Sequence, residues 1–163
     1  MNLMTAETGS SAGGLLAAVR SGQSSVTDVV SAGLAALHAV HEQTRAIAAF
    51  GDERALADAH RLDEAFAAGG VTGPLHGLPV TIKDWIDVEG FPCAGDTGEI
   101  DRWPKQDATV VARLRRAGAV VLAKTHAWGP SSAQARVLHP ADPGRTPGGS
   151  STGEAVVVAT GAC

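Results

Sequence analysis

The alternation of strand, helix and strand patterns in the second half of the chain constrains its fold most strongly. From Thr72 onward, glycine and proline separate short runs rich in β-branched residues, at Val80–Ile82 and Val120–Leu122. The segment Ala108–Ala117 between them has a helical pattern. Because parallel strands are joined by a long crossover, usually a helix, this order predicts an α/β fold with a parallel strand pair.

The first part of the chain is predicted to be helical. A short helix ends at Ser21-Gly22, and a second helix begins with a capping box formed by Ser25 and Asp28. A third helix begins at Asp52 and stops at Gly69-Gly70, the usual place for glycine after a helix end. Apolar residues recur at helical spacing along the second helix, at Val26, Val29, Val30, Leu34, Leu37 and Val40. We expect these helices to pack on or beside the sheet.

A glycine-rich loop near the end of the sequence carries two adjacent hydroxyls, at Ser150 and Ser151. The flanking residues Gly148, Gly149 and Gly153 allow the backbone to approach another group closely. Such a loop suits serine chemistry or anion binding at a helix start, and Ser151 with Thr152 is expected to cap a helix that begins near Gly153.

A lysine stands at the end of the first predicted strand. Lys83 follows the buried run Val80–Ile82, an unusual place for an ammonium group. Lysine and serine form a known nucleophilic pairing, in which the lysine accepts a proton only when it is neutral. Lys83 and Ser150 are therefore candidate catalytic residues.

Three stretches in order along the chain resemble the amidase signature family of hydrolases. These stretches are Gly73–Asp84, Asp107–Thr125 and Asp142–Ser151. The resemblance implies an incomplete, truncated amidase domain over residues 1–163, in which residues 1–70 are helical and residues 71–163 begin a mixed or parallel α/β core.

The same resemblance implies a Ser-cisSer-Lys triad. Lys83 matches the base and Ser150 matches the bridging serine in a cis peptide, while Gly148, Gly149 and Ser151 match the supporting loop. The nucleophilic serine of the family lies a couple of dozen residues farther along, beyond Cys163. The implied reaction is hydrolysis of a small carboxylic amide to an acid and an amine through an acyl-serine, without a cofactor. This chain alone is expected to be inactive.

Three residues depart from the family's pattern. His126 stands where an asparagine is common, His139 replaces an asparagine before proline, and Thr152 replaces a glycine beside the bridging serine. The substrate class within the family is therefore left open.

Other functions remain alternatives. The chain fits a non-catalytic fragment or pseudoenzyme, or the glutaminase subunit of a tRNA-dependent amidotransferase, which would need protein partners. A phosphate- or nucleotide-binding module is less favoured, because the glycine loop lacks the Gly-Lys-Ser/Thr ending of a phosphate loop.

Composition argues against several classes of partner. A net charge of -4 with scattered basic residues disfavours direct nucleic-acid binding, and no apolar run is long enough to span a membrane. His38 and His41 have a spacing that could hold a metal, but no constellation of Glu or Cys residues nearby completes a ligand set, so no metal site is predicted. Two cysteines, and no basic residue before Arg20, predict a cytoplasmic protein. Unpaired sheet edges are expected to favour self-association.

Overall fold

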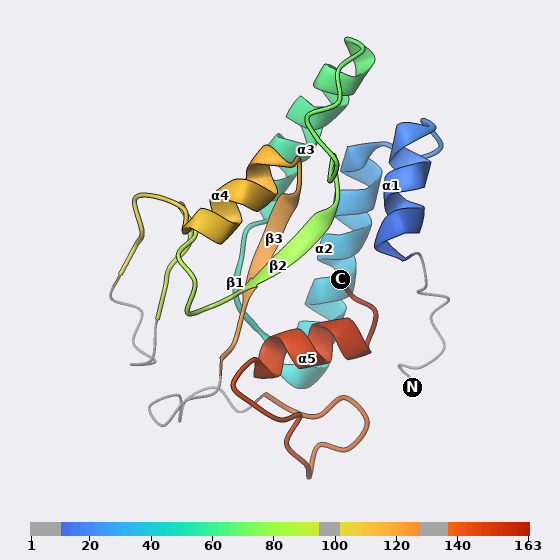
Figure 1. Ribbon diagram of the computed structural model, residues 1–163. Coiled ribbons are helices and arrows are strands. Elements are labelled where there is room, and N and C mark those ends of the chain that lie inside the picture. The colour runs from blue at the N-terminus through green and yellow to red at the C-terminus, as the bar shows by residue number, and fades with distance from the viewer. Residues whose placement is uncertain (1–10, 95–101, 128–136) are drawn as a thin grey trace.

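The structure is a computed structural model, and it describes residues 11–94, 102–127 and 137–163. The helices are α1 (Ala12–Arg20), α2 (Val26–Thr44), α3 (Asp52–Ala67), α4 (Thr109–Arg116) and α5 (Thr152–Ala159). The strands are β1 (Ile47–Phe50), β2 (Pro79–Lys83) and β3 (Val120–Thr125) (Figure 1). The predicted α/β class is confirmed.

The sheet is mixed, with the strand order β1-β3-β2. Strand β2 is parallel to β3, and α4 lies between these strands in the sequence, as the strand–helix–strand pattern predicts. Strand β1 is antiparallel to β3 and pairs Ile47 with Thr125. Strand β1 was not predicted from the sequence: the part of the chain expected to be helical also contributes a strand to the sheet.

The starts and ends of the first three helices follow the local sequence. Ser25 accepts a hydrogen bond from the Asp28 backbone, and the Asp28 carboxylate accepts one from Ser25, which confirms the capping box of α2. Helix α1 ends at Arg20, with Ser21 as its C-cap. Helix α3 ends at Ala67, just before Gly69, whose φ of 84° places it in the left-handed region.

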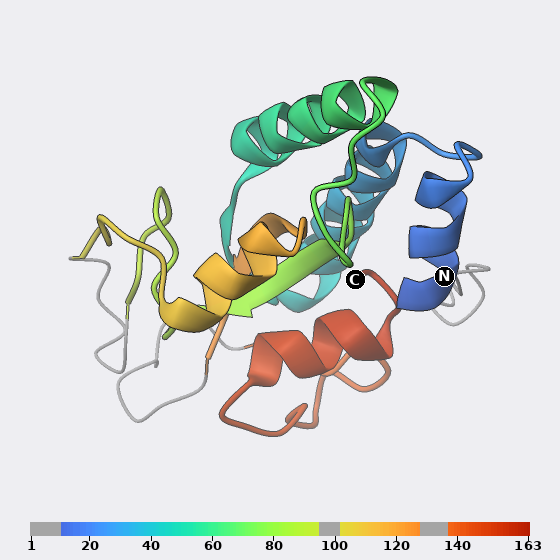
Figure 2. The ribbon, with the colours of Figure 1, turned by 45° about the horizontal axis from the view of Figure 1, so that its top comes forward.

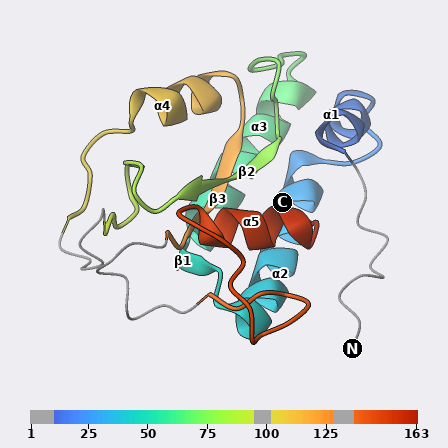
Figure 3. The ribbon, with the colours of Figure 1, turned by 60° about the horizontal axis from the view of Figure 1, so that its bottom comes forward.

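Two apolar clusters cover the two faces of the sheet. The larger joins β3 to α2, α3 and α5, and includes Leu37, Leu122 and Val156. The smaller joins Ile82 and Val121 to Val111 of α4. In Figure 2, β2 passes between α4 and α5, and Figure 3 shows α5 beside α2. Alternate residues of β2 therefore meet different helices.

Across the ranges that the structure describes, no helix combines the length and the apolar character needed to cross a bilayer.

Candidate active site

Strand β2 places Lys83 on the face of the sheet toward α5. Val80 and Ile82 belong to the apolar cluster on the α4 side, so alternation places Thr81 and Lys83 on the other side. Lys83 is half-buried, and its Nζ lies 4.6 Å from the ring centroid of Trp85. The aromatic face shields one side of the amine and leaves its other side to the serine loop.

The structure brings together the two residues that the sequence analysis singled out. Lys83 Nζ lies 2.6 Å from Ser150 Oγ and 3.1 Å from Ser151 Oγ, and donates a hydrogen bond to each. Both serines are exposed. The peptide bond between Gly149 and Ser150 is cis. An amine and a hydroxyl at 2.6 Å are within reach for direct proton transfer.

The glycine loop is closed by its own polar groups. Gly148 has a φ of 97°, which favours glycine, and its backbone N–H donates to Thr146 Oγ1 at 3.2 Å. Thr152 Oγ1 donates to the Gly148 carbonyl at 3.3 Å. Thr152 is buried, so the side chain that departs from the family's glycine fits inside the loop and joins its two ends.

Ser151 is the N-cap residue of α5, as predicted, but the prediction that its side chain caps the helix is wrong. Helix α5 begins at Thr152, and the side chain of Ser151 makes no capping hydrogen bond. Its hydroxyl instead accepts a hydrogen bond from Lys83. The lysine amine, carried by a distant strand, provides this hydroxyl with a partner that local sequence patterns do not show.

Gly153 lets the loop sit directly on the ends of the strands. Its backbone N–H donates to the His126 carbonyl at 2.9 Å. A Cβ at this position would collide with the Ala46 carbonyl oxygen and lie 2.8 Å from the His126 nitrogen. The absence of a side chain at Gly153 therefore fixes how closely the two serines approach the sheet.

Lys124, which was not predicted from the sequence as a site residue, lies at the same end of the sheet. Its side chain is fully buried, and its Nζ donates to the carbonyls of Asp84 at 3.1 Å and Pro92 at 3.3 Å. The Asp84 carboxylate lies 3.6 Å from the same Nζ. Burial lowers the pKa of Lys124, and the Asp84 charge opposes that shift. A lysine directly after the apolar run Val120–Ala123 was the available signal.

Glu154 was also missed. Its two carboxylate oxygens accept hydrogen bonds from Thr81 Oγ1 at 2.8 Å and Thr125 Oγ1 at 2.9 Å. An acidic residue in the first turn of a helix is common in any protein, so its sequence position alone carried no specific signal.

The two histidine departures have structural partners. The His126 backbone N–H donates to the Ala46 carbonyl, and the His126 carbonyl accepts from the Gly153 N–H. Burial lowers the pKa of the His126 imidazole. His139 Nδ1 accepts hydrogen bonds from the backbone amides of Ala141 and Asp142, so this side chain organises a turn. Within the described ranges, no group of three potential metal-ligating side chains occurs.

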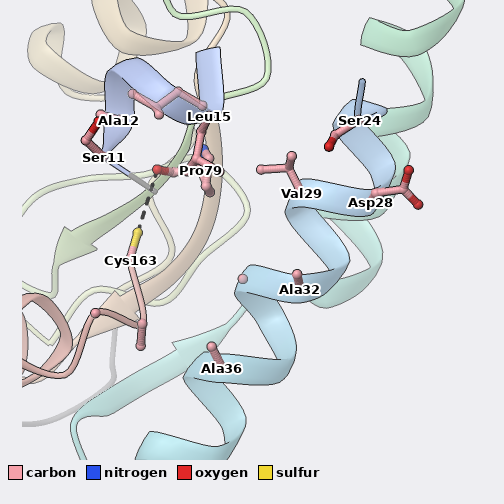
Figure 4. Close-up of a pocket in the computed structure, with 14 residues that line it drawn as sticks. Ser11, Ala12, Leu15, Ser24, Asp28, Val29, Ala32, Ala36, Pro79 and Cys163 are labelled. Carbon is pink, nitrogen blue, oxygen red and sulfur yellow. Dashed lines mark hydrogen bonds between the residues drawn. The ribbon is translucent and has the colours of Figure 1, made fainter. Parts of the chain in front are cut away.

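A groove of about 690 Å³ lies apart from the lysine and serines (Figure 4). Its walls come from α1, α2, the start of β2 and the segment after α5, and include Leu15, Val29, Pro79 and Cys163. Lys83, Ser150 and Ser151 are not among the residues that line it. The groove is therefore separate from the candidate active site.

Comparisons with known proteins give consistent matches. The family model described as Amidase matches residues 28–163. A glutamyl-tRNA(Gln) amidotransferase subunit of Salinispora arenicola (strain CNS-205) is 38% identical over 164 residues, which cover 96% of this chain and 33% of that protein. Indoleacetamide hydrolase of Bradyrhizobium diazoefficiens (strain USDA 110) is 37% identical over 153 residues, which cover 89% of this chain and 29% of that protein.

Solved structures give the same result. The native peptide amidase from Stenotrophomonas maltophilia matches with a TM-score of 0.82 and 31% identity, over 97% of this chain and 35% of its own. A fatty acid amide hydrolase shares the fold, with a TM-score of 0.88 at 23% identity over 95% of this chain and 29% of its own. The chain spans about a third of the length of the relatives it matches.

Proposed function

Because this chain belongs to the Amidase family, we propose that it supplies the base and the proton relay for hydrolysis of carboxylic amides. The single observation that carries this proposal is the 2.6 Å contact between Lys83 Nζ and Ser150 Oγ. A serine hydroxyl donates and accepts at once, so Ser150 can pass its proton to a neutral Lys83 while it receives one from a nucleophile.

The reaction then proceeds through an acyl-serine. The nucleophilic serine attacks the carbonyl carbon, the C–N bond breaks, and the nitrogen leaves as an amine or ammonia with the proton that Lys83 and Ser150 return. Water hydrolyses the ester to the acid. Ser151 is the last serine of the sequence, so we propose that the nucleophile comes from outside these 163 residues and that the chain alone does not hydrolyse amides.

Gly148, Gly149 and Ser151 act as supporting residues in this proposal. The closed glycine loop holds Ser150 toward Lys83, and Ser151 accepts a second hydrogen bond that orients the amine. Residues 1–163 would form part of one amidase domain, and a cytoplasmic location stays a prediction from the sequence.

A chimera tests the assignment of Lys83 and Ser150. Residues 1–163 would replace the matching third of the Stenotrophomonas maltophilia peptide amidase, and ammonia release from a panel of amides would be measured. We expect the chimera to hydrolyse an amide, and Lys83→Ala and Ser150→Ala each to reduce the rate about 10²–10⁴-fold. Lys105→Ala changes an exposed lysine and is the matched control. Undiminished hydrolysis by the Lys83→Ala chimera would contradict the proposal.

A second candidate is a role within a larger, multi-chain enzyme. Several relatives that are 34–39% identical to this chain are glutamyl-tRNA(Gln) amidotransferase subunits. This candidate predicts that the chimera hydrolyses glutamine better, relative to other amides, than the parent peptide amidase does in the same assay. A preference for amides without an amino-acid backbone favours a stand-alone hydrolase instead.

We also propose that the chain self-associates. Among the described residues, β1 and β2 are edge strands of the sheet, and the groove of Figure 4 exposes apolar wall residues. Sedimentation velocity over a range of concentrations measures this directly. A single monomeric species at every concentration would exclude it.

A further inference from the structure

We propose that Glu154 is a positioning residue that holds the serine loop against Lys83. This inference rests on the proposed function for its significance, although the contact itself is a property of the fold. Glu154 follows Ser150 by four residues and lies in the first turn of α5, so hydrogen bonds that anchor its side chain also restrain the start of the helix that carries the loop.

The two hydroxyls that Glu154 binds come from both parallel strands. Thr81 belongs to β2 and Thr125 to β3, and their Oγ1 atoms donate to separate oxygens of the Glu154 carboxylate at 2.8 and 2.9 Å. The carboxylate therefore bridges two adjacent strands at the place where α5 meets them. One carboxylate with two acceptor oxygens suits two donating hydroxyls.

The strand register links these hydroxyls to the candidate base. Thr81 precedes Lys83 by two residues and therefore lies on the same face of β2. Thr125 is the residue opposite Lys83 in the pairing of β2 with β3. The side chains of Thr81, Lys83 and Thr125 thus form one polar group on the α5 face, and every member contacts the segment Ser150–Glu154.

Two kinds of contact hold the start of α5, close packing at Gly153 and the hydrogen bonds of Glu154. Close packing at Gly153 sets the distance between the helix and the strand ends. The packing of a glycine does not by itself set the rotation of the helix about its axis, whereas two directed hydrogen bonds to separate strands do. Glu154 is half-buried, so water competes only partly for these bonds.

A general contribution to helix stability predicts something different. An acidic residue in the first turn interacts favourably with the helix dipole wherever it lies. Glu53 also lies in the first turn of its helix, α3, and is exposed, so Glu53→Ala is the control for that general effect.

NMR spectroscopy of the 163-residue chain tests the proposal without any hydrolysis. The signature is the nuclear Overhauser effect between the Lys83 Hε and Ser150 Hβ protons, together with the backbone amide shifts of Ser150 and Ser151. We expect Glu154→Ala to lose the cross-peak and to shift both amides, and Glu154→Gln to retain most of both. Glu53→Ala should leave the signature unchanged.

Two further variants keep the test decisive if Glu154→Ala does not fold. Thr81→Val and Thr125→Val each remove one hydroxyl with little change in side-chain volume, and each is expected to weaken the same cross-peak. The proposal would be overturned if Glu154→Ala, or both valine variants, kept the wild-type cross-peak and the wild-type amide shifts. Because the readout is a contact, an amidase assay that fails in the chimera refutes the proposed function without deciding the role of Glu154.

Discussion

Lys83 and Lys124 lie at the same end of the sheet but on opposite faces, and they differ in burial and in hydrogen-bond partners. Lys83 is half-buried and contacts two serine hydroxyls. Lys124 is fully buried and contacts two backbone carbonyls and the Asp84 carboxylate. Lys124 of β3 pairs with Ile82 of β2, and Ile82 directly precedes Lys83, so the two lysines are one position apart in the strand register.

The difference lies in what the partners can do. Carbonyl and carboxylate oxygens only accept hydrogen bonds, so Lys124 acts as a donor and holds the chain after β2 in place. Hydroxyls both donate and accept, so the partners of Lys83 can also deliver a proton to it. Two lysines at one sheet end thus divide into a structural group and a candidate chemical group. Substitutions on each face test whether the two lysines differ in role.

Removal of the buried lysine should have the largest effect on stability. Lys124→Ala leaves Asp84 without its charged partner and opens a cavity beside Pro92, and breaking a buried pair in this way costs about 3–5 kcal/mol. Urea unfolding measures the change in the free energy of unfolding. A loss below about 1 kcal/mol would mean that water reaches this face and that the two lysines are less different than their burial indicates.

A side chain at Gly153 should have the next largest effect. Gly153→Ala places a Cβ against the Ala46 carbonyl and the His126 backbone, and overpacking of this kind costs about 1–3 kcal/mol. The expected result is displacement of α5 and loss of the Lys83–Ser150 contact, with the Lys124 contacts intact. A crystal structure of the variant with both contacts preserved would contradict this.

Replacement of Lys83 should barely change stability. Lys83→Met keeps an unbranched aliphatic side chain and removes only the half-exposed amine that lies beside the Trp85 ring, so we expect the free energy of unfolding to change by less than about 1 kcal/mol. The same variant should reduce the rate of hydrolysis in the chimera by about 10²–10⁴-fold, as Lys83→Ala does. A large loss of stability would place Lys83 with Lys124 among the structural residues.

The smallest expected effect is a pH dependence of stability. Burial lowers the pKa of Lys124 in the folded chain below its ordinary value of 10.5. Between the folded-state pKa and the unfolded-state pKa, the unfolded chain therefore binds more protons than the folded chain. The free energy of unfolding therefore rises with pH in that interval. Urea unfolding from neutral to alkaline pH should show this rise for the wild type relative to Lys124→Met. Parallel profiles would refute the lowered pKa, and Lys105→Met serves as the control.

Features with local causes could be predicted from the sequence. The capping box of α2 depends on Ser25 and Asp28 alone, and the strand–helix–strand pattern of the core follows from apolar runs separated by glycine and proline. The pairing of Lys83 with Ser150 came from residue chemistry together with a family resemblance, and the structure places the two side chains in contact.

Features that depend on distant contacts were missed. Strand β1 has only the residues Ile-Ala-Ala-Phe, without a polar–apolar alternation, and exists because β3 offers an edge. Local rules favour Ser151 as a helix-capping side chain, but its hydroxyl instead accepts a hydrogen bond from Lys83 of the distant strand β2. Glu154 and Lys124 gain their significance from hydrogen bonds to residues 29 or more positions away.

The central place of β3 sets an order of events during synthesis. Strand β1 is complete at Phe50, but its only partner among the described strands ends at Thr125. At about 5–20 residues per second, a ribosome takes roughly several seconds to cover that interval. During this time the segment Ile47–Phe50 lacks the partner that makes it a strand, so its apolar side chains and unpaired backbone groups stay open to chaperones or other nascent chains until β3 is made.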